Sequence, residues 1–490
     1  MKIVIIIYFV VLPLSLFGQH RADSLITIPV DSTRSSFTLI EKKRGKAVSI
    51  NVSLNMVMRG FNRFILEDEY AQINLQSMRN NINTLPVWDS DRFSTNLIGH
   101  PFHGSMYFNS ARTNGFGFYQ SSLVTAAGSL MWEYLMETKP PSHNDLWATT
   151  VSGTALGEIL FRLSDLILDN RETGVERVGR ELLAGVLTPT RFVTRLTTGE
   201  AWKVAQNRGN LVFAPPYRLE LYLGETGTGL SDRDSGLWST TLGADLNYGE
   251  LYSISVGKPY EWFRATGEAS IRNSRLYLTQ FNTIGLLHHR ELYQNEDSWL
   301  TAGLFQHFNY YDLKQASDEP NATPLYISEA AAIGPGIIVH KRKSNSEAQF
   351  GAHLSGIILG ASASDHFKLG DRDYNFGSGF SLKIHGSFQF SRKLFFSLFA
   401  ENYRLYSWKG VDDYDKLKNL TIDEIDFLNV QGDESNARLY LLGLKMRYSL
   451  SERINFLLRA RHLTRNTMYT HFPEINNHFN EFFFGIGITV

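Results

Sequence analysis

The sequence lacks cysteine entirely among its 490 residues, which excludes disulfides, thiolate metal ligands and a cysteine nucleophile. It also lacks an excess of either charge, because 48 basic and 49 acidic residues leave a formal net charge of −1. A near-neutral chain offers no electrostatic basis for nucleic-acid binding. Proline is scarce, with 14 residues, and the mean hydropathy of −0.19 is too low for a bundle of membrane-spanning helices.

Aromatic residues and glycine are abundant by contrast. The chain has 33 Phe, 22 Tyr, 8 Trp and 39 Gly, which is typical of a protein built from many strands. With 43% hydrophobic and 20% charged residues, it is not a disordered chain.

The first residues indicate export. Lys2 precedes a short apolar run from Ile3 to Phe17, which is interrupted by Pro13 and ends near the small residue Gly18. This pattern is typical of a signal peptide, so we expect cleavage after Gly18. Residues 1–18 are therefore predicted to be the signal peptide of an exported protein, and the polar residues 19–46 to be a tether.

The next part of the chain is predicted to hold one strand and then helices. Residues 48–56 alternate apolar and polar side chains, so we predict a strand followed by an irregular segment over 47–90. Residues 121–137, 142–169 and 175–187 favour helices within a helical domain over 91–195, where Pro140 and Pro141 end the first and Ser142 caps the second.

From about residue 217 to the end the hydrophobic period becomes two. Phe380–Phe390 is one example, and in the C-terminal residues Phe482, Phe484, Ile486, Ile488 and Val490 alternate with Gly485, Gly487 and Thr489. The strands approach the length of about 9 to 11 residues that crosses a bilayer. We therefore predict a transmembrane antiparallel β-barrel over 196–490, with about 12 strands and a range of about 10 to 14. The alternative is a soluble periplasmic β protein.

The densest cluster of chemically active residues lies in the predicted helical domain. The candidate catalytic residues are His103, Glu133, Asp145 and Glu158, and the candidate ligand-binding residues are His100, His103, Arg112, Glu137 and Arg162.

Two interpretations of this cluster stay open. Glu158, Arg162 and Asp165 share one face of a helix, where they form either a charged site or a buried ion network. Thr149, Gly153 and Gly157, spaced by four, predict the close approach of a second helix.

Other chemistry is weakly indicated. The spacing His100-x-x-His103 differs from that of helical zinc sites, and Pro101 argues against a helix there, so we expect no metal and no cofactor. Three His-x-Ser pairs could form a nucleophile and base: His353 with Ser355, His385 with Ser387, and His103 with Ser105. Outer-membrane phospholipases and lipid A deacylases resemble this pattern, but their Asn after the Ser is absent here. For these pairs, ordinary lumen side chains are the alternative.

The residues His100-Pro101-Phe102-His103-Gly104-Ser105, Asn109-Ser110-Ala111-Arg112, Trp132-Glu133-Tyr134, Asn144-Asp145 and Gly157-Glu158 resemble the domain-of-unknown-function family 3943, over about residues 90–195. The resemblance implies an exported protein of the outer-membrane type and implies no catalytic residue.

These observations predict a non-enzymatic barrel of the cell outer membrane that binds or translocates a small solute or lipid. Its helical segment is expected to plug or cap the barrel. The alternative function is a lipid-modifying hydrolase or transferase. The expected partners are the outer-membrane bilayer and the barrel-assembly machinery.

Overall fold

The computed structural model describes residues 42–205, 215–230, 233–251, 258–313, 325–369, 372–411, 414–417, 420, 424 and 427–490. The predicted signal peptide and nearly all of the tether lie outside these residues. The chain forms two compact units. The helical unit comprises Met1–Asp89 with Ile98–Pro216, and the barrel unit comprises Ser90–Leu97 with Tyr217–Val490.

The helical unit contains eight described α-helices, joined in places by short π- and 3-10 turns. They are α2 (Arg44–Phe61), α3 (Leu75–Asn83), α4 (His100–Arg112), α5 (Phe118–Leu135), α6 (His143–Trp147), α7 (Gly153–Ile167), α8 (Gly174–Leu187) and α9 (Pro189–Thr198). The helices predicted over 121–137, 142–169 and 175–187 correspond to α5, to α6 with α7, and to α8. Among the described residues, no helix combines the length and the apolar character needed to span a membrane.

The strand predicted over residues 48–56 is wrong, because this segment lies within α2. A period-two pattern contains positions four apart, and those positions also share one face of a helix. Asn51 and Asn55, two polar positions of the pattern, share one such face and are buried. They donate hydrogen bonds to the carbonyls of Val124 and Gly128, respectively, at 3.3 Å each. Tertiary contacts therefore decide between two structures that the local pattern allows.

The prediction that Pro101 excludes a helix is also wrong. Pro101 lies in the first turn of α4. A proline there loses no hydrogen bond, since the first amides of a helix have no partner within it. The cap predicted at Ser142 is present at the start of α6, because the Ser142 hydroxyl accepts a hydrogen bond from the Asp145 amide at 3.2 Å.

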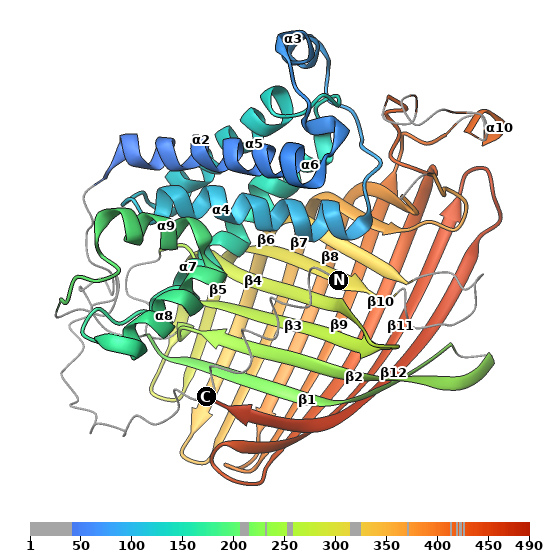
Figure 1. Ribbon diagram of the computed structural model, residues 1–490. Coiled ribbons are helices and arrows are strands. Elements are labelled where there is room, and N and C mark those ends of the chain that lie inside the picture. Colours follow the sequence, from blue (N-terminus) through green and yellow to red (C-terminus); the bar gives the residue numbers. More distant parts are fainter. Residues whose placement is uncertain are drawn as a thin grey trace. The chain divides into compact units, whose positions relative to one another are not determined.

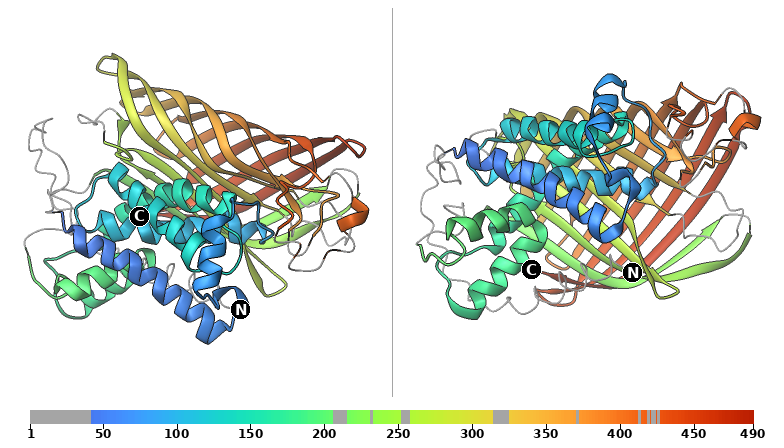
Figure 2. Two further views of the ribbon diagram at one scale, coloured as in Figure 1. Left: turned by 90° about the horizontal axis from the view of Figure 1, so that it is seen from above. Right: turned by 45° about the horizontal axis from the view of Figure 1, so that its top comes forward.

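The barrel unit is a closed antiparallel barrel of twelve described strands (Figures 1 and 2). The strands are β1 (Tyr217–Leu230), β2 (Arg233–Tyr248), β3 (Phe263–Arg272), β4 (Arg275–Gln294), β5 (Ser298–Asp312), β6 (Tyr326–Lys343), β7 (Ser346–Ala363), β8 (Tyr374–Gln389), β9 (Leu394–Ser407), β10 (Ser435–Ser449), β11 (Ile454–Tyr469) and β12 (Ile475–Thr489). β12 pairs with β1 and so removes both sheet edges. The predicted strand number and the closed antiparallel fold are confirmed.

Side chains alternate between the outside and the inside of the barrel. Phe388, Leu442 and Ile486 point outward and are 37%, 58% and 56% exposed. The alternate positions of the same strands point inward. They include Lys383 on β8 and Lys445 and Arg447 on β10. An apolar outside and a charged inside are typical of barrels of the outer-membrane type.

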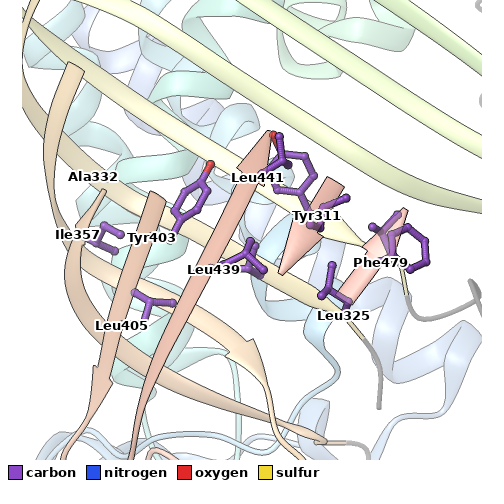
Figure 3. Packing of buried hydrophobic residues seen from close by; sticks show 12 residues of the cluster. Tyr311, Leu325, Ala332, Ile357, Tyr403, Leu405, Leu439, Leu441 and Phe479 are labelled. Atoms are coloured by element: carbon purple, nitrogen blue, oxygen red, sulfur yellow. The ribbon is translucent and has the colours of Figure 1, made fainter. Parts of the chain in front are cut away.

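Part of the interior is apolar. Twelve buried residues from β5 to β7, from β9 to β12 and from the β5–β6 connection pack against one another inside the barrel: Tyr311, Leu313, Leu325, Ile327, Ala332, Ile357, Tyr403, Leu405, Leu439, Leu441, Leu463 and Phe479 (Figure 3). We call this set the apolar layer. It lies toward the end of the barrel at which β10 begins. The inward residues later in β10 are charged, so the lumen changes from apolar to charged along its length.

The segment Ser90–Leu97 packs on the barrel wall. The ring of Phe93 lies 5.1, 4.5 and 5.3 Å from the rings of Tyr310, Tyr326 and Tyr374. Alternation along β8 places Tyr374 on the outward face, together with Leu382. These first residues of the predicted helical domain therefore contact the outside of the barrel. Plugging or capping by the rest of that domain stays a prediction.

Candidate functional site

Two of the predicted ligand-binding residues form ion pairs with Glu158, which is fully buried in α7. Arg112 Nε lies 2.8 Å from Glu158 Oε2, and Arg162 Nε lies 2.9 Å from Glu158 Oε1. Burial raises the pKa of Glu158, but the two guanidinium groups oppose burial and the net pKa lies below its ordinary value. Arg112, Glu158 and Arg162 therefore form a buried ion network, the second of the two interpretations of this helix face.

Asp165 takes a different partner. It pairs with Arg191 of α9, whose guanidinium also donates to the carbonyl of Phe161 at 3.1 Å. The aromatic ring of Phe161 lies 4.5 Å below the Arg191 guanidinium. This second pair links α7 to α9.

His103 lies near His100 but points into an aromatic environment. Its imidazole is 4.5 Å from the ring of Tyr107 and 5.0 Å from that of Trp132. Burial, and then the nearby His100, lower the pKa of His103 to about 3, so this histidine is neutral at physiological pH. A neutral, fully enclosed imidazole is a packed core residue, and the structure does not bring His103 to Glu133 or Asp145.

Three other candidates do converge. One ligand-type atom of each of His100, Glu133 and Asp145 lies within 4.8 Å of the others, and the Nε2 of His100 is 3.3 Å from Asp145 Oδ1. Burial, followed by the charges of Glu137 and Asp145, raises the pKa of Glu133. Among the described residues, this is the set of side chains that could hold a metal ion, although the sequence predicted none.

Charged side chains of the barrel cross its lumen. Lys445 of β10 lies 3.1 Å from Glu220 of β1 and also pairs with Asp245 of β2. The guanidinium of Arg459 lies 3.1 Å from Glu481 and pairs with Glu268 on β3. β11 and β12 are neighbours, so the pair of Arg459 with Glu481 lies along the barrel wall. β10 is not a neighbour of β1 or β2, and β11 is not a neighbour of β3, so the other three ion pairs span the interior.

A cluster of imidazoles lies on the inner faces of β5, β7 and β8. His307 and His353 have ring centroids 5.3 Å apart, and His353 and His385 stack at 5.5 Å. The Nζ of Lys383 is 3.2 Å from Nδ1 of His307 and pairs with Glu329. We call His307, His353 and His385 the lumen histidine cluster.

The cluster holds polar atoms without a protein partner. Within the described part of the chain, no group hydrogen-bonds to either ring nitrogen of His353, to Nε2 of His385 or to Oγ of Ser355. Arg264 of β3 acts electrostatically on His353 and His385, and no described acidic side chain forms an ion pair with it. Buried polar atoms are normally satisfied, so these atoms indicate a position for a polar ligand or water.

Glycines make room for these rings. A side-chain carbon at Gly336 would overlap the imidazole of His353, and one at Gly351 would overlap that of His385. The sequence places both glycines on strands, where glycine is otherwise unfavourable.

The three His-x-Ser pairs do not form catalytic pairs. A nucleophile and its base need a hydrogen bond of about 2.6 to 3.2 Å. Ser105 instead donates to the carbonyl of Phe102 at 2.6 Å, and Ser355 makes no hydrogen bond to His353. His385 has no described partner at Nε2, and the described contacts include no hydrogen bond between it and Ser387. The hydrolase alternative is therefore not favoured.

Sequence reasoning missed Arg264, His307 and Glu329 as lumen residues. Each lies on a strand, and strand alternation was the signal that could have found them. It identifies the polar face of a strand, but not which strands oppose each other across a closed barrel. Thr149 and Asn144 stood out in the sequence only through helix spacing and the family resemblance, and their hydrogen bonds to His100 and Asp145 were not predicted.

The fold and the polar interior define a closed barrel of the outer-membrane type. Residues 85–190 match the family described as "Domain of unknown function (DUF3943)", which confirms the resemblance drawn from the sequence. No curated protein matches the chain.

Several solved barrels are similar to this chain at low identity. The NanC porin is 9% identical over 54% of this chain and 98% of its own, with a TM-score of 0.26. The outer membrane channel DcaP of Acinetobacter baumannii is 8% identical over 57% and 100%, with a TM-score of 0.23. The CymD monoaromatic hydrocarbon channel is 11% identical over 56% and 88%, with a TM-score of 0.22. The barrel assignment rests on the strand pairing of this chain.

Proposed function

We propose that this protein is an outer-membrane barrel that binds a small anionic solute in its lumen, at the lumen histidine cluster beside Arg264. The observation that carries the proposal is the set of buried donor and acceptor atoms on His353, His385 and Ser355 that no described group satisfies. The outward apolar side chains support a position in the outer-membrane bilayer, and insertion of a closed barrel calls for the barrel-assembly machinery.

The charge around the cluster supports an anion as ligand. Arg264 donates to the amide oxygen of Gln349 and contacts the ring of Trp262 at 5.5 Å. Asp245 and Glu347 act on it electrostatically, but no described carboxylate forms an ion pair with it. A guanidinium binds carboxylate or phosphate groups in a fork of two hydrogen bonds. Lys383, Lys445 and Arg459 elsewhere in the lumen are paired with acids, whereas Arg264 forms no described ion pair and is close to the unsatisfied atoms of the lumen histidine cluster.

The apolar layer supports a barrel that binds or gates its solute over an open pore. A polar solute that has reached the charged part of the lumen meets buried leucine, tyrosine and phenylalanine side chains before it meets the other end. Passage therefore requires these side chains to move, which makes the barrel a gated or binding barrel and not an open pore.

Isothermal titration of the detergent-solubilised protein tests the proposal. Glucuronate and glucose are matched probes, since they differ by one carboxylate. We expect glucuronate to bind at least about tenfold more tightly than glucose, because a charge-assisted hydrogen bond contributes about 1.5 to 3 kcal/mol. The substitution Arg264→Gln should abolish the difference.

The control is Arg392→Gln, which removes an exposed arginine from the turn between β8 and β9. It should leave the affinity unchanged. Equal binding of both sugars by the wild-type protein, or unchanged binding of glucuronate in Arg264→Gln and His353→Gln, would contradict an anion site at this position.

A further inference from the structure

The strongest unassigned feature lies in the helical unit, where the ends of three helices meet. His100 begins α4, Glu133 lies near the end of α5, and Asp145 lies in α6. We propose that these three residues bind one divalent transition-metal cation, with Zn²⁺ or Mn²⁺ as the expected class. The proposal is independent of solute binding in the barrel.

The spacing of the three groups suits a single ion. Their ligand atoms lie within 4.8 Å of one another, and His100 Nε2 and Asp145 Oδ1 are 3.3 Å apart. Ligands that each lie about 2.1 Å from one ion are at most about 4.2 Å apart. Small rotations of the Glu133 and Asp145 side chains therefore bring all three atoms to ligand distance.

The surrounding residues hold the imidazole in the orientation that a metal requires. Nδ1 of His100 lies 3.3 Å from Oγ1 of the buried residue Thr149. When Nδ1–H donates to that hydroxyl, the lone pair of Nε2 faces the two carboxylates. Metal-binding histidines are typically oriented by a hydrogen bond of this kind.

The carboxylates are held in place as well. The backbone amide of Ser142 donates to Glu133 Oε2 at 2.8 Å, and the side-chain amide of Asn144 donates to Asp145 Oδ1 at 2.9 Å. Asn144 also donates to Asp89 Oδ1 at 3.0 Å, so one amide links two acidic residues. Such outer contacts fix the direction of ligand carboxylates.

The buried carboxylate of Glu133 gives a further reason to expect a cation at this position. Only 2% of this residue is exposed, yet among the described residues the Ser142 amide is the one hydrogen-bond donor to its carboxylate. The other oxygen accepts no described hydrogen bond. A buried carboxylate that lies close to the carboxylate of Asp145 is costly unless a cation accompanies it.

The donor set favours a transition metal over calcium or magnesium. Calcium takes six to eight oxygen ligands and magnesium retains its waters, whereas imidazole nitrogen suits zinc and related ions. One nitrogen and two carboxylates leave at least one coordination position for water. A bound ion would also tie α4, α5 and α6 together.

The test uses the full-length protein in detergent. The protein is dialysed against a chelator, freed of the chelator, and titrated with ZnCl₂ and separately with MnCl₂. We expect about one equivalent of metal per chain by elemental analysis after gel filtration, with an X-ray absorption spectrum of one nitrogen ligand and otherwise oxygen ligands. His100→Ala and Glu133→Gln should each weaken binding by more than about 100-fold, and Thr149→Val by about 10- to 100-fold.

The matched control is His143→Ala, because this residue is close in sequence to Asp145 but its imidazole packs at a tilt against Trp88, with ring centroids 5.7 Å apart. It should bind metal like the wild-type protein. Circular dichroism of each metal-free variant establishes that it is folded, and Asp145→Asn replaces any variant that is not. The proposal fails if the wild-type protein holds no stoichiometric metal, or if a folded Glu133→Gln variant binds as tightly as wild type, since both results mean that the three groups merely share hydrogen bonds.

Discussion

Glu158 illustrates how single residues stabilise the helical unit. Its carboxylate is fully buried, and Arg112 and Arg162 together compensate it. Removing one member of such a group leaves an uncompensated buried charge, which costs about 3 to 5 kcal/mol. The same residue also makes the stability of the unit depend on pH.

The pH dependence follows from the lowered pKa of Glu158. An unfolded Glu takes up its proton near pH 4.5, whereas the folded protein does so only at lower pH. The stabilising contribution is therefore complete above pH 4.5 and is lost as the pH falls through the lowered pKa of the folded state. We expect pulse proteolysis of the helical unit to show this loss in the wild-type protein, and Glu158→Gln to be less stable at pH 7 with a flatter acid profile.

Glu176→Gln is the control for Glu158→Gln, because Glu176 also pairs with an arginine, Arg180, but 37% of its side chain is exposed. An exposed pair contributes about 0 to 1 kcal/mol. If Glu158→Gln kept the acid profile of the wild-type protein, another carboxylate would be responsible for it.

The helices α4 and α7 depend on glycine at their crossing. A side-chain carbon at Gly153 would lie 2.6 Å from Cα of Gly104, and one at Gly157 would lie 2.8 Å from Cβ of Phe108. Both distances are well inside van der Waals contact, so the two backbones lie as close as the absence of side chains permits. The spacing of Thr149, Gly153 and Gly157 predicted this close approach, although the sequence did not identify α4 as the partner.

Gly153→Ala should therefore destabilise the helical unit by about 1 to 3 kcal/mol, because the added methyl group overpacks the crossing. Urea unfolding followed by limited proteolysis measures this change. Gly60→Ala in α2 is the matched control, since nothing lies within 4 Å of the added carbon, and it should stabilise by about 0.5 to 1 kcal/mol. Equal effects of the two substitutions would exclude crowding at the crossing as the cause.

The success of sequence reasoning differed between the two kinds of element. Barrel strands could be predicted because each is long, alternates strictly and faces two different environments, as in Phe380–Phe390. The segment 48–56 could not, because positions four apart share one face in a helix as well as in a strand, and the face that α2 buries carries Asn51 and Asn55 while Val48 and Met56 are exposed. His100, Glu133 and Asp145 were identified as chemically active, but only the packing of α4, α5 and α6 separates them from His103.

At the scale of the whole barrel, the arrangement of its interior determines what can pass. The charged part of the lumen holds ion pairs between strands that are not neighbours, and the apolar layer lies beyond it. Alternation predicted which side chains point inward, but the inward leucines of β10 were unexpected because outward Tyr440 and Leu442 flank them in sequence. Both faces of β10 are apolar there, so composition alone does not show that the lumen is filled.

The apolar layer predicts a low resting conductance. In planar bilayers the wild-type barrel should conduct poorly, and the double substitution Leu441→Ala with Phe479→Ala should raise conductance several-fold, because both side chains are 1% exposed and fill the layer. Leu442→Ala is the matched control, since Leu442 is 58% exposed on the outer face and its loss removes nothing from the lumen. A wild-type barrel that conducts steadily, or a double variant that remains as closed as the control, would mean that the layer does not determine the resistance. In that case the ion pairs that Lys445 and Arg459 form across the lumen would be the next candidates for the resistance, to be tested by substitution.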